Sequence, residues 1–516
     1  MFYGLASVSR RPVLLLLALG CLAVPAPAGA AASARTAGPG RAHLPAPLTT
    51  GHPDGAGPVI GPVGHAGRWL VDRAGRVLVT HGLNLVAKRP PYLPSRLGFG
   101  ADDARWIRAQ GFTSVRLGII ATGVQPTRGP FDEAYLDDIA ATIRILHAAG
   151  LMTLVDLHQD YYTESTGGQG FPGWMVHDRP GLARLGLGRR DAAPFDGLWS
   201  DDGGVQDDIA RLWTHVAARL RAEPGILGYD LFNEPYPGSR ADECAQVAGC
   251  PAFDRTVLAP FFRRLIAGVR AADPEHLVFV EPGVSFNQGA ASHLGDTGDD
   301  RTGFSFHVYC SEVPGAPPCD VRRPAAFTNA QRQAAVGGDA LLLTEFGATE
   351  DLARLTGVLD EADRAMVGWQ QWAYYNEDPC CARPHEGLVH TLDRPPGPDT
   401  VKAGKLALLA RPTPVLIAGT PTGWHWDAEA GRLQVRWSTV RADARSALRT
   451  LGAMRPRPAY TDEGQVSVIE VPPASVPGGW RVQVTGGRVI SAARQRTVRV
   501  RADPGAAAVT VVVQRT

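Results

Sequence analysis

The chain contains 516 residues, which is more than one average domain and enough for a large barrel with a smaller module. Its hydrophobic content of 44% is sufficient for a large buried core. Lys and Arg number 52 and Asp and Glu number 51, so no overall charge directs the protein to nucleic acid or to an acidic membrane.

The first thirty residues have the composition of a signal peptide. Two consecutive arginines precede the apolar run Val13–Val24, and Ala28-Gly29-Ala30 forms a small-residue cleavage signal. The apolar run is too short to be a permanent membrane anchor. We therefore expect residues 1–30 to be removed and the protein to be secreted. Lipid modification of Cys21 is the alternative, although the three residues before it fit a lipobox poorly.

Six cysteines remain after the signal peptide, and an even number in an exported protein suggests disulfide bonds. They are Cys244, Cys250, Cys310, Cys319, Cys380 and Cys381. Short separation favours the pairs Cys244–Cys250 and Cys310–Cys319, although six cysteines allow many connectivities. A zinc site is the alternative, but no CxxC pair with matching histidines occurs.

Residues 31–62 are rich in Ala, Gly, Pro and Thr without periodicity, which predicts a disordered linker. Ordered structure is expected from about Trp69, where two apolar runs flank the turn sequence Asp72-Arg73-Ala74-Gly75. This predicted hairpin leads into the first strand of the next domain.

Residues 63–410 alternate short apolar runs with helical patterns, which indicates parallel βα units. The clearest helical patterns are Asp132–Ala149, Val205–Arg221 and Leu258–Ala272. Eight strands with helical crossovers favour a closed TIM (β/α)8 barrel over an open sheet, and no GxGxxG motif follows the first strand. The predicted strands are Val77–Asn84, Ser114–Ile119, Met152–His158, Ile226–Asn233, Leu277–Glu281, Phe304–Tyr309, Ala340–Glu345 and Gly368–Ala373.

Residues 411–516 show a different pattern, in which apolar runs are separated by Gly, Pro and Asp. The runs "RLQVRWSTV", "VSVIEVP", "WRVQVTGG" and "AAVTVVVQ" predict a C-terminal all-β sandwich. This module has two interpretations. It could be a sugar-binding domain that exposes Trp424, His425 and Trp426, or a structural support packed on the barrel, which we favour.

The active site of a (β/α)8 barrel lies at the C-terminal ends of its strands. Polar or aromatic side chains end nearly every predicted strand, and two of these strands end in the carboxylates Glu234 and Glu345. Glycoside cleavage requires two carboxylates, because one protonates the leaving oxygen and the other attacks the anomeric carbon. Further candidates at these ends are Lys88, Arg116, His158, Asp160, Asn233, His307, Tyr309 and Trp372.

Each candidate also has a structural interpretation. A glutamate at a strand end is more often a helix cap or an ion-pair partner, and we assign that role to Glu281. The histidines could be hydrogen-bonded rim residues, and Arg116 could be a buried structural ion pair. The joint placement of these residues at successive strand ends is what favours a functional interpretation.

Two segments carry a resemblance to a known family. "DLFNEP", which contains Asn233 and Glu234, and "LLLTEFG", which contains Glu345, resemble the acid/base and nucleophile motifs of glycoside hydrolase family 5. The resemblance covers roughly residues 69–410. It implies that the remaining site residues are Arg116, His158, His307, Tyr309 and Trp372.

A narrower resemblance is to the endoglycoceramidases within that family. "GLNLVAKRPPY" resembles their first-strand motif and implies Lys88 as a sugar contact. "DLHQDYY" followed by "GGQGFPGW" resembles their third-strand loop and implies Asp160 and Trp174 as sugar contacts. These enzymes also carry a β-sandwich after the barrel.

The resemblance implies cleavage with retention through a covalent glycosyl-enzyme. Glu345 attacks as an anion, and Glu234 donates a proton to the aglycone oxygen and then removes one from water. The expected donors to Glu345 are Arg116, His307 and Tyr309. Asn233 is expected to bind the sugar 2-hydroxyl, and Trp174 and Trp372 to stack on sugar rings. No metal or cofactor is required.

The implied substrate is a glycosphingolipid, cut between oligosaccharide and ceramide. We therefore expect a monomer that binds glycolipid or oligosaccharide, contacts membrane surfaces transiently and binds no nucleic acid. Phe171, Trp174, Met175 and Trp199 suggest an apolar groove, but they are equally consistent with packing. The alternative is a β-glucanase or β-glucosidase of the same family. A non-catalytic carbohydrate-binding protein is disfavoured, because both glutamates are present.

Overall fold

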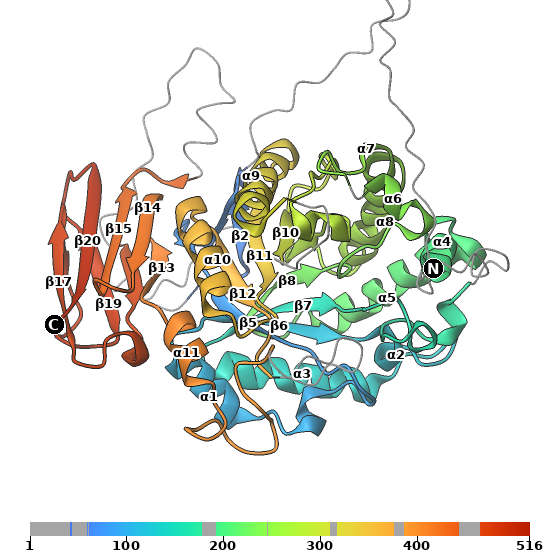
Figure 1. Cartoon of the computed structure of the whole chain (residues 1–516), viewed down its shortest axis with the longest axis horizontal. Coiled ribbons are helices and arrows are strands. Elements are labelled where there is room, and N and C mark those ends of the chain that lie inside the picture. The colour runs from blue at the N-terminus through green and yellow to red at the C-terminus, as the bar shows by residue number, and fades with distance from the viewer. Residues whose placement is uncertain are drawn as a thin grey trace, which may run out of the picture. The chain divides into compact units, whose positions relative to one another are not determined.

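Eight parallel strands form a closed barrel in the computed structural model of the chain (Figure 1). They are β5 (His81–Leu85), β6 (Ser114–Ile119), β7 (Met152–Leu157), β8 (Ile226–Asp230), β9 (Leu277–Val280), β10 (Thr302–Val308), β11 (Ala340–Phe346) and β12 (Gly368–Gln371). The predicted barrel is confirmed. The structure describes residues 42–43, 59, 61–177, 192–244, 246–309, 317–375, 386–442 and 465–516, all within one compact unit over residues 37–516.

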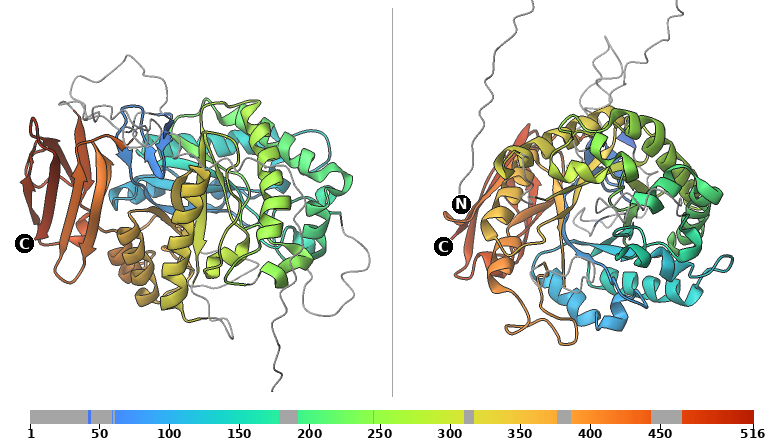
Figure 2. Two further views of the ribbon diagram at one scale, coloured as in Figure 1. Left: turned by 90° about the horizontal axis from the view of Figure 1, so that it is seen from above. Right: turned by 45° about the vertical axis from the view of Figure 1, so that its right-hand side comes forward.

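Helices surround the barrel strands (Figure 2). Asp132 caps the helix Glu133–Ala148 by accepting a hydrogen bond from the Tyr135 amide. This helix then buries an apolar stripe against the strands. The three helices predicted most clearly are confirmed to within two residues at either end. The helices are α1 (Ala101–Ala109), α2 (Ala121–Val124), α3 (Glu133–Ala148), α4 (Ala192–Trp199), α5 (Val205–Leu220), α6 (Ala241–Cys244), α7 (Pro251–Phe253), α8 (Ala259–Arg270), α9 (Cys319–Gly337), α10 (Leu352–Ala365) and α11 (Ala403–Leu409).

The first predicted strand, Val77–Asn84, is wrong as a single element. The structure divides it into β4 (Val77–Leu78), which pairs with β13 (Thr413–Ile417) outside the barrel, and β5, which begins the barrel. The predicted hairpin is confirmed, since β4 pairs with β3 (Trp69–Val71) across the turn at Asp72. A continuous buried apolar run gives no signal for the point where the chain leaves one sheet for another.

Two antiparallel sheets form the predicted C-terminal sandwich, and segments from before the barrel extend one of them. The larger has the order β1-β2-β3-β4-β13-β16-β19-β18 and the smaller β14-β15-β20-β17. Within the predicted linker, Ala42–His43 is not irregular but forms β1, paired with β2. The strands not yet given are β1 (Ala42–His43), β2 (Gly64–Ala66), β14 (Thr420–Asp427), β15 (Arg432–Ser438), β16 (Val466–Glu470), β17 (Trp480–Thr485), β18 (Gly487–Val489), β19 (Thr497–Ala502) and β20 (Ala508–Arg515).

Trp424 and Trp426 on β14 are buried, which contradicts their interpretation as an exposed sugar-binding face. The Trp424 indole donates to Asp363 on α10 at 3.1 Å, and the Trp426 amide donates to the same carboxylate at 3.0 Å. Figure 1 shows β14 beside α10. The interpretation of the sandwich as a support packed on the barrel is therefore the one that fits these contacts.

The disulfide Cys244–Cys250 is present as predicted. Cys319 is also disulfide-bonded, while its predicted partner Cys310 lies outside the described residues, as do Cys380 and Cys381. The predicted signal peptide lies outside them as well. Among the residues that are described, no helix has the length and apolarity to cross a membrane.

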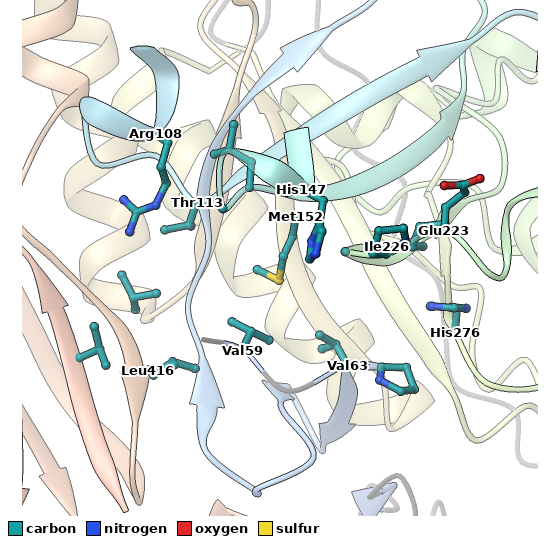
Figure 3. Close-up of a pocket in the computed structure, with 18 of the residues that line it drawn as sticks. Val59, Val63, Arg108, Thr113, His147, Met152, Glu223, Ile226, His276 and Leu416 are labelled. Atoms are coloured by element: carbon teal, nitrogen blue, oxygen red, sulfur yellow. The ribbon is translucent and has the colours of Figure 1, made fainter. Parts of the chain in front are cut away.

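A pocket of about 660 Å³ lies at the end of the barrel where its strands begin (Figure 3). Met152 and Ile226 at the starts of β7 and β8 line it, together with Val63 and with Leu416 from the sandwich. The active sites of (β/α)8 barrels lie at the other end, and neither predicted catalytic glutamate lines this pocket.

Candidate active site

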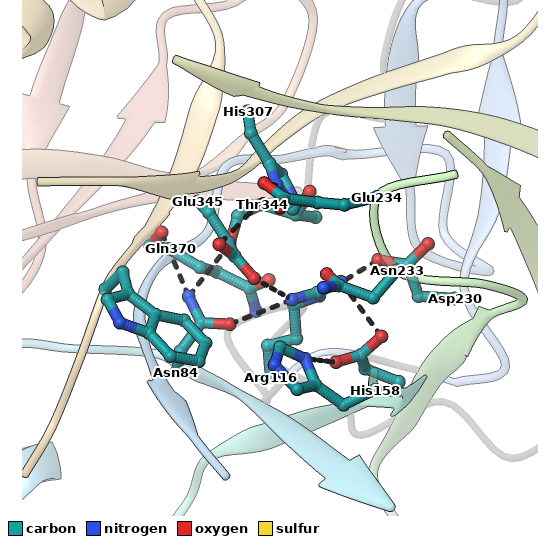
Figure 4. Close-up of polar contacts among 12 residues, drawn as sticks. Asn84, Arg116, His158, Asp230, Asn233, Glu234, His307, Thr344, Glu345 and Gln370 are labelled. Atoms are coloured by element: carbon teal, nitrogen blue, oxygen red, sulfur yellow. Dashed lines mark hydrogen bonds and ion pairs between the residues drawn. The ribbon is translucent and has the colours of Figure 1, made fainter. Parts of the chain in front are cut away.

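Arg116 on β6 is the centre of the polar cluster at the C-terminal ends of the strands (Figure 4). Its side chain is fully buried, and all three of its nitrogens donate hydrogen bonds. The acceptors, at 2.6 to 3.2 Å, are Asn84, Asp156, Asp230, Asn233, Glu281 and Glu345. These carboxylates raise the pKa of Arg116 well above its ordinary value despite the opposing effect of burial. The guanidinium therefore fixes six side chains from five other barrel strands or the loops after them.

Glu345 on β11 accepts hydrogen bonds from two of the three donors predicted for it, Arg116 and Tyr309, and the third, His307, lies within ion-pair distance. Arg116 Nη1 lies 2.6 Å from Oε1, the Tyr309 hydroxyl donates to Oε2 at 2.7 Å, and His307 Nδ1 lies 3.5 Å from Oε2. The Glu345 side chain is 5% exposed. Figure 4 shows its carboxylate between the Arg116 guanidinium and His307. A carboxylate held by these donors has the fixed orientation that a nucleophile needs.

Glu234 follows β8 and has a left-handed backbone, with φ of 46°. Its Oε1 atom accepts hydrogen bonds from His307 Nδ1 at 2.8 Å and from Asn287 Nδ2 at 2.5 Å. Its backbone N–H donates to Glu281 Oε2 at 2.9 Å. One carboxylate oxygen of Glu234, one of Glu345 and a ring nitrogen of His307 all lie within 4.8 Å of one another. The two predicted catalytic carboxylates thus face a common centre.

His158, Asp160, Lys88 and Trp372 form a second group beside Arg116. His158 Nδ1 lies 2.8 Å from Asp156, and its ring stacks on Trp372 with centroids 5.2 Å apart. Lys88 Nζ lies 2.6 Å from Asp160 and 4.3 Å from the Trp372 ring centroid. A cation, a carboxylate and an aromatic face converge here, and these are the groups that bind sugar hydroxyls and stack on sugar rings.

Two predicted sugar contacts have other partners in the structure. Trp174 donates its indole N–H to the Gln125 carbonyl at 3.1 Å and lies near Arg128, so these contacts do not bring it to the glutamates. Asn233 binds Arg116 through its oxygen and the Gln159 carbonyl through its nitrogen. Because an amide nitrogen carries two hydrogens, one of them is still available for a sugar hydroxyl.

The suggested apolar groove is largely packing. Phe171 and Met175 are fully buried, and Phe171 stacks on Tyr162 and Phe232. Trp199 packs edge-on against phenylalanines of the core and donates to a backbone carbonyl. In contrast, the side chain of Tyr161, which follows Asp160, is 45% exposed.

The surroundings of Glu234 favour the ionised form of its carboxyl. Burial would raise its pKa, but the hydrogen bond and charge of His307 lower it. Burial alone would lower the pKa of His307, yet the charges of Glu281 and Glu345 raise it well above its ordinary value. Burial also raises the pKa of Glu281 to about 8. The pKa of Glu234 is thus lowered, while the pKa values of its neighbours Glu281 and His307 are raised.

Two side-chain groups have the composition of a metal site. One is Glu234, His307 and Glu345, and the other is Asp156, Asp230 and Glu281. Arg116 donates to every member of the second group, and His307 donates to Glu234 in the first. Both sets of carboxylates therefore already have cationic or hydrogen-bonding partners from the protein.

Sequence reasoning missed several side chains of this cluster. It assigned Glu281 an ordinary structural role, whereas Glu281 contacts Arg116, His307 and the Glu234 backbone. It did not single out Asn287 or Glu386, which accepts the Trp372 indole N–H at 3.0 Å. Glu281 could have been found, because it follows the fifth strand as Glu234 follows the fourth. Asn287 lies in the short helix Val284–Gln288 and Glu386 lies outside the helices and strands, so neither directly follows a strand signal.

Two carboxylates at the mouth of a barrel, with donors fixed around them, define a glycoside hydrolase. The chain belongs to glycoside hydrolase family 5. The model of the family "Cellulase (glycosyl hydrolase family 5)" matches residues 99–378, and that of the "Glycoside hydrolase family 5 C-terminal domain" matches residues 411–513.

Similar proteins include several endoglycoceramidases. Endoglycoceramidase I of Rhodococcus hoagii is 33% identical over 473 residues, which cover 87% of each chain. The endoglycoceramidase of Cyanea nozakii is 27% identical and covers 73% of this chain and 81% of that one. The lactosyl-enzyme intermediate of endo-glycoceramidase II from Rhodococcus sp. is 25% identical with a TM-score of 0.67, covering 86% of this chain and 99% of that chain.

Proposed function

We propose that this protein is a secreted, retaining endo-β-glycosidase that hydrolyses the bond between oligosaccharide and ceramide in glycosphingolipids. One observation carries the proposal. A carboxylate oxygen of Glu234, a carboxylate oxygen of Glu345 and a ring nitrogen of His307 all lie within 4.8 Å of one another. Carboxylates about 5–5.5 Å apart are typical of retaining glycosidases, whereas inverting enzymes leave space for a water molecule between them.

In the proposed mechanism Glu345 attacks the anomeric carbon and Glu234 protonates the departing ceramide oxygen. Glu234 then takes a proton from water, which releases the sugar. Arg116 and Tyr309 orient the nucleophile through their bonds to its two oxygens. The capture of a lactosyl-enzyme intermediate in a solved relative supports the covalent step.

The sugar would lie against Trp372, with Lys88 and Asp160 binding its hydroxyls. Their mutual contacts, at 2.6 Å for the ion pair and 4.3 Å for the cation over the ring, fix these groups in advance. The names of the similar proteins support a ceramide aglycone. The exposed aromatic ring of Tyr161, next to Asp160, suits contact with the lipid or with a membrane surface.

The test is to incubate the purified protein with lactosylceramide, galactosylceramide, glucosylceramide and cellohexaose and to weigh the products by mass spectrometry. We expect lactosylceramide to give intact lactose and ceramide. Cleavage of cellohexaose without any cleavage of glycosphingolipid would refute the proposed substrate and favour a glucanase. The Glu345→Ala variant serves as the matched control for contaminating activities.

A further inference from the structure

Glu281 contacts the proposed acid/base directly through its backbone and indirectly through His307. Its Oε2 atom accepts the backbone N–H of Glu234 at 2.9 Å, at the residue whose left-handed φ of 46° sets the direction of the side chain. Its Oε1 atom lies 2.8 Å from Arg116 Nη2 and 3.3 Å from His307 Nε2. Glu281 is 2% exposed, so its carboxyl group contacts these protein groups rather than water.

His307 connects Glu281 to Glu234 through its two ring nitrogens. Nδ1 bonds Glu234 Oε1 at 2.8 Å, while Nε2 is buried and has no well-aligned hydrogen-bond partner among the described residues. Glu281 Oε1 is the carboxylate oxygen that faces Nε2, at 3.3 Å. An imidazole between two carboxyls can pass a proton from one to the other by exchanging tautomers.

We propose that Glu281 is a positioning residue that orients Glu234 through its backbone and shares a proton with it through His307. This inference rests on the proposed role of Glu234. In the relay, the imidazolium of His307 gives its Nδ1 proton to Glu234 Oε1 and keeps its Nε2 proton toward Glu281. His307 becomes a neutral imidazole and Glu234 a neutral acid, so the total charge is unchanged. The path reverses after Glu234 takes a proton from water in the second step.

The other charged groups around Glu281 favour a shared proton. Arg116 on β6 and His307 on β10 face it as cations, whereas Asp156 on β7 and Asp230 on β8 face it as carboxylates within 4.8 Å. Burial beside these carboxylates opposes ionisation of Glu281, and its raised pKa of about 8 agrees with that arrangement. Glu281 can therefore keep its proton at neutral pH.

The test compares Glu281→Gln with the wild type in the pH profile of kcat/KM. Without the Glu281 carboxyl His307 loses a partner that raises its pKa, so the alkaline limb for lactosylceramide should move down by about one pH unit. A 2,4-dinitrophenyl lactoside needs no acid in the first step, so its pre-steady-state burst rate should stay within about threefold. Glu281→Asp, which keeps a carboxyl, should restore much of the limb.

Glu386→Gln is the matched control, because it removes another buried carboxylate of the cluster, one whose side chain accepts the Trp372 indole N–H rather than a bond from Glu234 or His307. It should slow both substrates in parallel without moving the limb. An unmoved limb in Glu281→Gln, or equal losses on both substrates, would overturn the proposal. If Glu281→Gln does not fold, Glu281→Asp is measured instead, and equal losses on lactosylceramide and on the dinitrophenyl lactoside would overturn the proposal. If the proposed function itself is wrong, the wild-type protein will not cleave lactosylceramide.

Discussion

The assignment of roles to Glu234 and Glu345 predicts opposite behaviour of their alanine variants. Glu234→Ala removes the group that protonates the leaving oxygen, and general acid catalysis contributes about 10²–10⁴-fold, so turnover of lactosylceramide should fall by about that factor. A dinitrophenyl glycoside leaves without protonation, so its first step should remain fast. The second step then lacks its base, and a burst of dinitrophenol should precede a slow phase.

Glu345→Ala removes the nucleophile, so an activated leaving group cannot restore the normal route. The structure predicts that this variant still folds. It loses two charge-assisted hydrogen bonds, from Arg116 and Tyr309, each contributing about 1.5–3 kcal/mol. Arg116 keeps three other carboxylates, so its buried charge remains compensated. Circular dichroism and thermal unfolding would verify the fold before kinetics are measured.

Azide distinguishes the two roles by product stereochemistry. It needs no deprotonation, so with Glu234→Ala it should attack the glycosyl-enzyme and give a β-glycosyl azide. With Glu345→Ala it should enter from the vacated side and give the α-azide. Proton NMR of the anomeric centre identifies each product. If Glu345→Ala shows the burst and Glu234→Ala gives the α-azide, the roles are reversed, and if both variants keep near-normal turnover, neither residue is catalytic.

Three further predictions follow from individual contacts. Asp363→Ala leaves the Trp424 indole and the Trp426 amide without their acceptor. Unfolding in guanidinium should therefore show that the free energy of unfolding falls by about 3–5 kcal/mol, with a smaller loss for Asp363→Asn. An unchanged unfolding midpoint would exclude the supporting role of the sandwich. Burial lowers the pKa of His158, but Asp156 and Asp160 raise it to about 9. The stability that this raised pKa contributes is complete below about pH 6.5 and is lost as pH rises through about 9. The melting temperature should therefore fall across that range, and it should fall less in His158→Gln. N-terminal sequencing of the secreted protein should start after Ala30, and a start at Met1 or at a lipidated Cys21 would contradict the signal peptide.

The barrel was predictable because its strands are buried on both faces and separated by amphipathic helices. Each such strand is a short apolar run, and β6 matches its predicted bounds to the residue. The ends were less predictable. The predicted strand Ile226–Asn233 ends at Asp230 in the structure. Beyond it Leu231 and Asn233 each keep a single backbone hydrogen bond, to Phe279 and Leu157, and regular strand pairing ends before Glu234.

The candidate site was predictable where chemistry follows a strand in sequence, as for Glu345 and His307. It was not predictable where a side chain reaches the site from a long loop. Asn287 lies in the short helix Val284–Gln288, six residues beyond Glu281, and nothing in the local pattern distinguishes it from an ordinary turn residue. Trp174 shows the converse case, since its motif predicts a sugar contact but its indole N–H binds a backbone carbonyl.

Arg116 explains how one barrel can hold so many acids without losing its fold. A guanidinium presents five N–H donors in a rigid plane and remains charged when buried, whereas a lysine ammonium presents three from a single point. Here the plane joins Asp156, Asp230 and Glu281 below to Glu345 above. The same cation thus offsets the structural acids and orients the proposed nucleophile Glu345. Glu234 is the carboxylate among these five that Arg116 does not bind. In the proposed mechanism its protonation can change because its hydrogen-bond partner is His307 rather than Arg116.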